Sequence, residues 1–220
     1  MSLQTFFQEF IQAIANFASQ GVLTKEVLQD YSKAKLALHG ILESALVQAG
    51  WRIGWLPVVE PRVDLSLPFV PSSYNPNLLE KRKRHLFRPA LGYYRNNKLE
   101  VFAECCTTDE AYEYNPSNQT IIYDPEGRGW ITKREILHHF VQHAKPKLSE
   151  LIICVALPHK MKKKPPWRQY KGIGNNFYGQ FKQGWDGLVQ TLQKYTPTHL
   201  IVLEEKGVNI NNIHYPINIH

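Results

Sequence analysis

The segment that most constrains the fold runs from Phe87 to Cys106, FRPALGYYRNNKLEVFAECC. Two stretches rich in β-branched and aromatic residues flank the polar sequence Arg95-Asn96-Asn97-Lys98. Asparagine tolerates the positive φ angles that a two-residue hairpin turn requires. The segment therefore predicts a β-hairpin that turns at Asn96-Asn97.

The second arm of this hairpin carries a carboxylate that needs an explanation. Side chains alternate along a strand, so Leu99, Val101, Ala103 and Cys105 are expected on one face and Glu100, Phe102, Glu104 and Cys106 on the other. Glu104 lies late in an otherwise apolar strand, where burying an unpaired carboxylate is costly. The sequence leaves two explanations open: a protein partner such as Arg88, or a bound metal ion.

Length and composition predict a single domain. The chain has 220 residues, of which 43% are hydrophobic, enough for a substantial core. It has neither an apolar run of membrane-spanning length nor a secretory signal pattern, which predicts a cytoplasmic protein without a membrane partner. Three cysteines, two of them adjacent, form neither a disulfide framework nor a zinc-binding pattern.

Charge is unevenly distributed along the chain. The net charge is +7, which favours an anionic partner. Residues 159–194 contain eight Lys or Arg and one acid, whereas residues 104–126 contain six acids and no Lys or Arg. A basic segment near an acidic one suits a protein that holds a phosphate backbone and a divalent cation. Two solvated surfaces of opposite sign are the plainer alternative.

The N-terminal region predicts two helices. Apolar residues recur at spacings of three and four between Leu3 and Phe17, with Gly21 as the stop; this helix is expected to pack on the domain or on a second subunit. A longer helix is expected from the Thr24 cap to about Ala49, ending at Gly50. Glu43 lies on this longer helix.

The rest of the chain predicts a mixed sheet with helical crossovers. The expected strands are 51–57, 63–69, 120–123, 151–157 and 199–203 besides the hairpin, and the expected helices are 131–144, capped by Thr132, and 177–195. His139 and His143 are four residues apart on the first of these helices, a spacing that permits a shared metal but is more typical of surface histidines. The 207–220 tail is expected to add an edge strand or to cross to a partner.

At this point the chain resembles the restriction-endonuclease-like, or PD-(D/E)XK, nuclease superfamily, whose core runs helix, three antiparallel strands, helix, strand (αβββαβ). The residues that carry the resemblance are LHGILESALVQAGWRIGW, similar to the family's first helix with its acidic residue at Glu43, and the hairpin segment, similar to the family's Pro-Asp and Glu-x-Lys pattern. The resemblance divides the chain into a helical extension (1–22), a nuclease-like core (36–157), a basic loop with a helix and strand (158–206) and a tail (207–220).

The resemblance implies a Mg²⁺ site with specific residues. In such enzymes carboxylates hold the ion and a lysine helps to orient the attacking water. Here the family's aspartate falls on Ala90 and its lysine on Cys106, and a two-residue turn would place Pro89 opposite Glu104. We therefore expect the catalytic residues to be Glu43, Asp64 and Glu104 and the metal ligands to be Asp64, Glu104 and Asp109.

A basic segment between the last two predicted strands is the candidate nucleic-acid contact. It interleaves cations with aromatic rings, so that cations can meet phosphates while rings stack on bases. Its alternative is a solvated loop. The expected contact residues are Lys162, Lys163, Lys164, Trp167, Arg168 and Lys171.

Three functions remain open from the sequence. The first is a homodimeric protein that binds double-stranded DNA and cuts it with Mg²⁺. The second is a catalytically inactive nucleic-acid-binding or assembly protein on the same scaffold. The third is a small enzyme with Cys106 as nucleophile, served by His39 or His138. The positions of the carboxyl groups of Glu43, Asp64, Glu104 and Asp109 discriminate between the first two.

Overall fold

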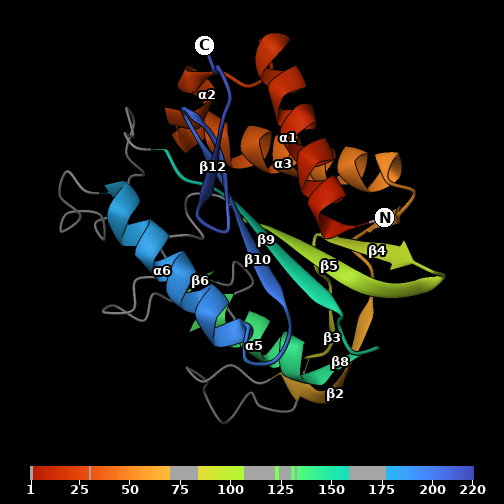
Figure 1. Cartoon of the computed structure of the whole chain (residues 1–220). Helices are drawn as coiled ribbons and strands as arrows, with labels where there is room; N and C mark the ends of the chain where they lie inside the picture. The colour runs from red at the N-terminus through yellow and green to blue at the C-terminus, as the bar shows by residue number, and fades with distance from the viewer. Residues whose placement is uncertain are drawn as a thin grey trace.

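A computed structural model describes residues 2–29, 31–69, 84–106, 122–123, 130–131, 133–158 and 177–220. Its centre is a mixed seven-stranded sheet with helices on both faces (Figure 1). The helices are α1 (Leu3–Ser19), α2 (Lys25–Gln29), α3 (Tyr31–Arg52), α5 (Lys133–His143) and α6 (Phe177–Leu192). The central strands, in spatial order, are β1 (Leu56–Val59), β4 (Leu91–Arg95), β5 (Lys98–Cys106), β9 (Glu150–Ala156), β10 (Thr198–Glu204), β11 (Gly207–Ile210) and β12 (Ile213–Pro216).

Strand directions follow from the connections. The tight hairpin makes β4 antiparallel to β5, and β1 is antiparallel to β4. The crossovers through α5 and α6 make β5, β9 and β10 parallel neighbours. The predicted mixed α/β architecture is therefore confirmed. A small sheet, β3-β2-β8, joins Arg84–Phe87, Val63–Phe69 and Ala144–Lys145, and Ile122–Tyr123 (β6) pairs with Trp130–Ile131 (β7).

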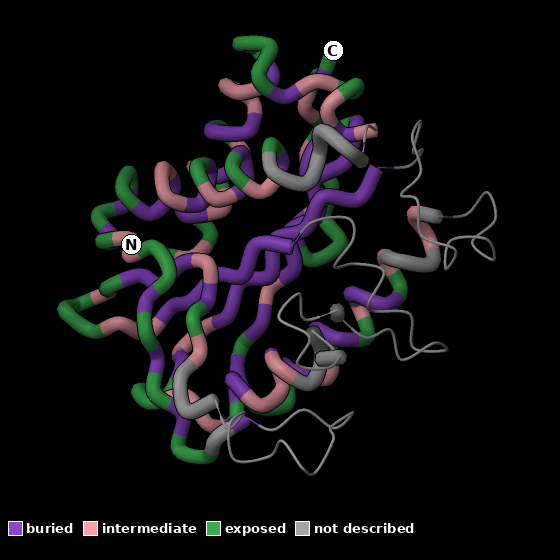
Figure 2. Tube along the Cα trace, turned by 180° about the vertical axis from the view of Figure 1, so that it is seen from behind, coloured by how far each residue is buried: buried purple, intermediate pink, exposed green. Residues whose placement is uncertain are grey.

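Each face of the central sheet has its own hydrophobic core. The first core lies under α1, α2 and α3 and includes Phe6, Phe10 and Leu42. The second lies under α5 and α6 and includes Phe102, Phe140 and Trp185. Figure 2 shows that the middle strands of the sheet, β5, β9 and β10, are buried for most of their length. The continuous apolar run predicted as a central strand is β9, which contributes alternate side chains to both cores.

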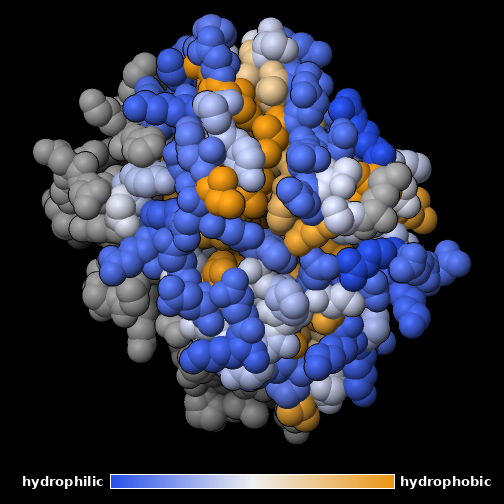
Figure 3. All heavy atoms as spheres, viewed as in Figure 1, coloured by the Kyte–Doolittle hydropathy of each residue, from blue (hydrophilic) through white to orange (hydrophobic). Residues whose placement is uncertain are grey.

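The N-terminal helix packs on its own chain. Its aromatic stripe is buried in the first core, where Phe6 stacks on Trp55 with ring centroids 5.3 Å apart. A band of hydrophobic residues is visible at the surface between α1 and β12 (Figure 3). Within the described part of the chain, no helix has the length and apolar character needed to span a bilayer.

The second predicted helix ends at a different glycine from the one expected. The structure has two helices, α2 and α3, and α3 continues past Gly50. Gly54 follows the end of α3 and has a φ of +75°, which is typical of a left-handed helix cap. The Trp55 amide donates to the Gly50 carbonyl at 2.9 Å. Gly50 has another role: a Cβ there would come within 2.6 Å of the Tyr93 ring.

The hairpin turns where predicted, but its register was predicted wrongly. Asn96 and Asn97 have φ angles of 52° and 61°. The pairing shifts between Tyr93 and Tyr94, because Tyr94 pairs with Leu99 whereas Tyr93 pairs with Val101. Such a bulge inserts one extra residue, here Glu100. As a result Leu99 lies on the opposite face of β5 from Val101 and packs against the second core. Continuing the register places Ala90, and not Pro89, opposite Glu104.

Two further predictions are corrected by the strand positions. Residues 51 and 52 belong to α3, so the first strand is β1 and not 51–57. The strand 63–69 forms as β2, but it lies in the small sheet. The C-terminal tail takes the first of its two expected roles, since it adds the antiparallel strands β11 and β12 at one edge of the central sheet.

Candidate functional site

The parallel strands β5, β9 and β10 end together at one edge of the sheet, which we call the carboxyl edge. Cys106 lies beside Val155, and Ala156 lies beside Leu203. Ligands of open α/β sheets bind outside the carboxyl ends of the strands. The acidic segment follows β5, and the basic segment joins the end of β9 to the start of α6. The topology therefore means that both charged segments begin at this edge.

Glu104 is held by the protein itself. The side chain shares the α5/α6 face of β5 with Phe102 and Cys106, which belong to the second core. It is 8% exposed, and its Oε2 accepts a hydrogen bond from the Ala90 amide at 3.0 Å. Ala90 therefore supplies a backbone donor to this carboxylate.

Glu43 lies on the opposite side of the sheet. The buried face of α3 packs in the first core, and the Glu43 Oε2 pairs with His39 Nδ1 at 3.6 Å. Burial is the main cause that raises the pKa of Cys105, and the charges of Glu104 and, to a smaller extent, of Glu43 add to that shift. The helix that carries Glu43 therefore packs on one face of the central sheet, whereas Glu104 extends from the other face of β5.

The other expected carboxylates do not complete a metal site among the described residues. Asp64 is exposed on β2, opposite Leu86 and Lys145 of the small sheet. Asp109 lies outside the described residues. Within the described ranges no group of three His, Cys, Asp or Glu side chains is placed to hold a metal ion. The Mg²⁺ site at Glu43, Asp64, Glu104 and Asp109 therefore stays a prediction.

The basic residues of the expected contact surface also lie outside the described residues. They are Lys162, Lys163, Lys164, Trp167, Arg168 and Lys171. The two ends of their segment are described: the Leu157 amide donates to Leu203 at 2.9 Å, and α6 begins at Phe177.

A second buried acid at this edge was missed from the sequence. Glu204 ends β10 and is 5% exposed, and its carboxylate accepts a hydrogen bond from the Tyr178 hydroxyl of α6. Burial, followed by this contact with Glu204, raises the pKa of Tyr178. The acidic pair Glu204-Glu205 after an apolar run was the available signal, but its partner could not be read from the sequence.

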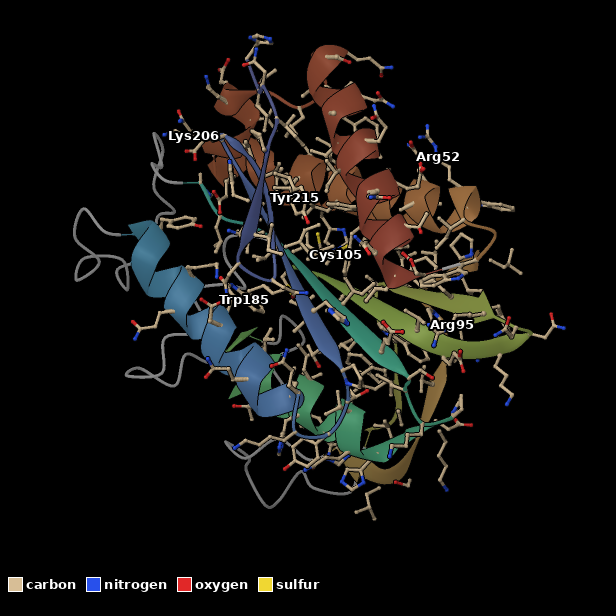
Figure 4. All side chains as sticks on the ribbon, in the orientation of Figure 1. Arg52, Arg95, Cys105, Trp185, Lys206 and Tyr215 are labelled. Atoms are coloured by element: carbon tan, nitrogen blue, oxygen red, sulfur yellow. The ribbon has the colours of Figure 1, made fainter. Side chains whose placement is uncertain are left out.

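The amino edge, at the other end of these strands, carries a compact ionic network. The Arg95 guanidinium donates from Nε to Glu100 and from Nη1 to Glu150, both at 2.7 Å. His199 Nε2 lies 3.6 Å from the second oxygen of Glu150. The hydrogen bond from His199, with that from Arg95, lowers the pKa of Glu150, and the Arg95 contact lowers the pKa of Glu100. Figure 4 shows Arg95 and Lys206 at opposite ends of the sheet.

The residues of the cysteine hypothesis lie on different elements. Cys106 is fully buried in the second core, His39 lies on α3, which packs on the first core, and the His138 ring of α5 lies 5.0 Å from the Tyr195 ring between centroids. His139 Nε2 donates to the Leu67 carbonyl at 2.8 Å, and His143 Nδ1 lies 3.2 Å from the Ser66 hydroxyl. These two histidines therefore fasten α5 to β2.

Comparison with protein-family models, with curated proteins and with solved structures finds no match to this chain.

Proposed function

We propose that this chain is a nucleic-acid-binding protein whose contact surface lies at the carboxyl edge, on a scaffold similar to that of restriction-endonuclease-like nucleases. The observation that carries the proposal is the position of the basic segment in the chain. It connects β9 to α6 and so begins at the edge where open α/β sheets bind ligands. Lysine and arginine meet phosphates there, while Trp167 and Tyr170 are suited to stacking on bases or packing in a groove.

The scaffold comparison is supported by the order of elements. Omitting the small sheets, the chain runs α3, β1, β4, β5, α5, β9, which is a helix, three antiparallel strands, a helix and a strand. The register also places Ala90 beside Glu104, the two positions that correspond to the family's acidic pair. The separation of Glu43 from Glu104 favours the catalytically inactive form of this scaffold.

The test is DNA binding by a charge-reversed variant. We expect K162E/K163E/K164E to weaken the binding of a duplex of about 20 base pairs by more than roughly 30-fold, and to reduce the salt dependence of log Kd by about 2 to 3. Fluorescence anisotropy across a salt series measures both quantities. Binding that is unchanged in this variant, or absent from the wild type, contradicts the proposal.

A matched control is available at the amino edge and in the adjoining small sheet. Lys98, Lys145 and Lys147 are exposed and lie before or beside the starts of β5 and β9. The variant K98E/K145E/K147E makes the same change in net charge. We expect it to weaken DNA binding by less than about three-fold, because its charges lie away from the contact surface.

The second candidate is a Mg²⁺-dependent endonuclease that acts on double-stranded DNA as a homodimer. The specific observation in its favour is the pairing of Glu104 with the position of the family's aspartate, close to where the chain continues toward Asp109. The experiment is plasmid cleavage with Mg²⁺ by the wild type, E104Q and D109N, together with sedimentation for the dimer. Cleavage by the wild type that both variants abolish would favour this candidate over the inactive scaffold.

A further inference from the structure

An open groove of about 680 Å³ lies beside the carboxyl edge, on the α2 side of the sheet. One wall comes from α2 and the other from the β10–β11 turn and the C-terminal segment. Its lining includes Lys25, Gln29, Glu205, Lys206 and residues 216–219.

The two lysines of the groove stand on a well-defined backbone. The Lys25 amide donates to the His220 carbonyl, and the Ile217 amide donates to the Lys206 carbonyl, both at 3.0 Å. Gly207 permits the close approach of β12, because a Cβ there would lie 2.1 Å from the Tyr215 carbonyl oxygen. The C-terminal segment therefore fixes the backbone of both Lys25 and Lys206.

Two exposed lysines line the groove. Lys25 and Lys206 are exposed, and neither forms an ion pair with another described residue. Glu205, the acid of the lining, is 7% exposed and accepts a hydrogen bond from Gln29 Nε2 at 3.3 Å. The accessible charge at the groove is therefore cationic, which suits a phosphate-bearing ligand.

We propose that this groove binds phosphates of the nucleic-acid backbone and extends the contact surface across the carboxyl edge to α2. Lys206 lies two residues beyond the end of β10, and the neighbouring strand β9 leads directly into the basic segment. The groove is open to solvent, so its lysines are accessible to a polymer. This inference rests on the proposed function and adds Lys25 and Lys206 to its phosphate contacts.

The experiment compares DNA binding by wild type and K25E/K206E across a salt series. Both side chains are exposed, so we expect the variant to keep the wild-type circular dichroism spectrum and midpoint of thermal unfolding. We expect roughly ten-fold weaker binding and a reduction of about 2 in the salt dependence of log Kd, because two phosphate contacts are lost. The control is K98E/K147E, which reverses the same number of charges and should weaken binding less than about two-fold.

The outcomes separate this inference from the proposed function. If the wild type binds DNA and K162E/K163E/K164E weakens binding while K25E/K206E matches its control, the groove inference alone is overturned. If the wild type does not bind DNA, both fail. Inorganic pyrophosphate serves as a small competitor. If pyrophosphate binds the wild type but not K25E/K206E, and does not change the affinity of the wild type for DNA, the groove binds a small phosphorylated ligand and the inference is overturned.

Discussion

The two ends of the parallel strands use charge in different ways. At the amino edge, Arg95 contacts Glu100 and Glu150 at 2.7 Å each, so cation and anions neutralise one another. At the carboxyl edge, Glu104 and Glu204 are satisfied by a backbone amide and a tyrosine hydroxyl. Lys25 and Lys206 stay exposed there. At the amino edge the charges are paired within the protein, whereas at the carboxyl edge two lysines stay accessible to solvent.

A high density of charged residues does not by itself mark a binding surface. The ionic network at the amino edge contains more closely spaced charges than the groove, but its members are each other's partners. A ligand responds to charge that the fold leaves accessible. Substitutions at the amino edge should therefore change stability, and charge reversals at the carboxyl edge should change binding.

The largest expected effect on stability is at Arg95. Arg95→Ala leaves the partly buried carboxylates of Glu100 and Glu150 without their guanidinium partner, and should lower the free energy of unfolding by about 3 kcal/mol. Urea denaturation measures this loss. DNA affinity at a temperature where the variant is folded should match the wild type. A stability loss below that of the exposed control Lys98→Ala would contradict the structural role of this network.

Substitution of Glu104 should destabilise the fold mainly when it removes the hydrogen-bond acceptor. Glu104→Ala leaves the Ala90 amide without this acceptor and should destabilise the fold by about 2 kcal/mol, whereas Glu104→Gln retains an acceptor oxygen and should cost less than about 1 kcal/mol. Thermal and urea unfolding compare the pair. Equal losses in both variants would show that the negative charge matters more than the hydrogen bond.

Tyr178 tests the other buried acid of the carboxyl edge. Tyr178→Phe removes the hydroxyl that donates to Glu204 and should lower the free energy of unfolding by about 1.5 kcal/mol, because hydrogen bonds to charged groups contribute about 1.5 to 3 kcal/mol. The exposed Tyr195→Phe is the control and should have no measurable effect. If the two variants have the same unfolding curve, the contact between Tyr178 and Glu204 does not contribute to stability.

The smallest expected effect is a pH dependence that comes from the amino edge. The pKa values of Glu100 and Glu150 are lowered in the folded protein from an ordinary value of 4.5. The stability that they contribute is therefore present above pH 4.5 and is lost as pH falls through their folded pKa values. Urea unfolding from neutral pH to below pH 4 should show this loss, and Arg95→Ala should flatten it. A profile in the variant as steep as in the wild type would contradict the assignment to this network.

Local chemistry in the sequence predicted part of this fold. The Asn96-Asn97 turn, the period-two pattern of β2 and the apolar run of β9 each depend on neighbouring residues, and each forms in the structure. The bulge at Glu100 depends on distant groups. The Ser149 amide donates a hydrogen bond to the Glu100 carbonyl at 2.8 Å. The sequence around Glu100 does not predict that partner.

The candidate site was predictable in its residue types but not in its geometry. The sequence singled out Glu104, yet its facing relative to Glu43 depends on which side of the sheet α3 covers. Likewise, Gly50 matches a helix stop locally, but the Tyr93 ring packs against it and α3 continues to Arg52. The sequence pattern predicted that β2 is a strand, but not that it joins a separate small sheet.

The most direct test of the central claim is amide hydrogen exchange of the whole chain with and without duplex DNA. We predict that DNA slows exchange at Lys206 and in the peptides that span residues 158–177, both at the carboxyl edge, and leaves exchange at the turn from Asn96 to Lys98 unchanged. Protection at that turn, with none at the carboxyl edge, would contradict the account.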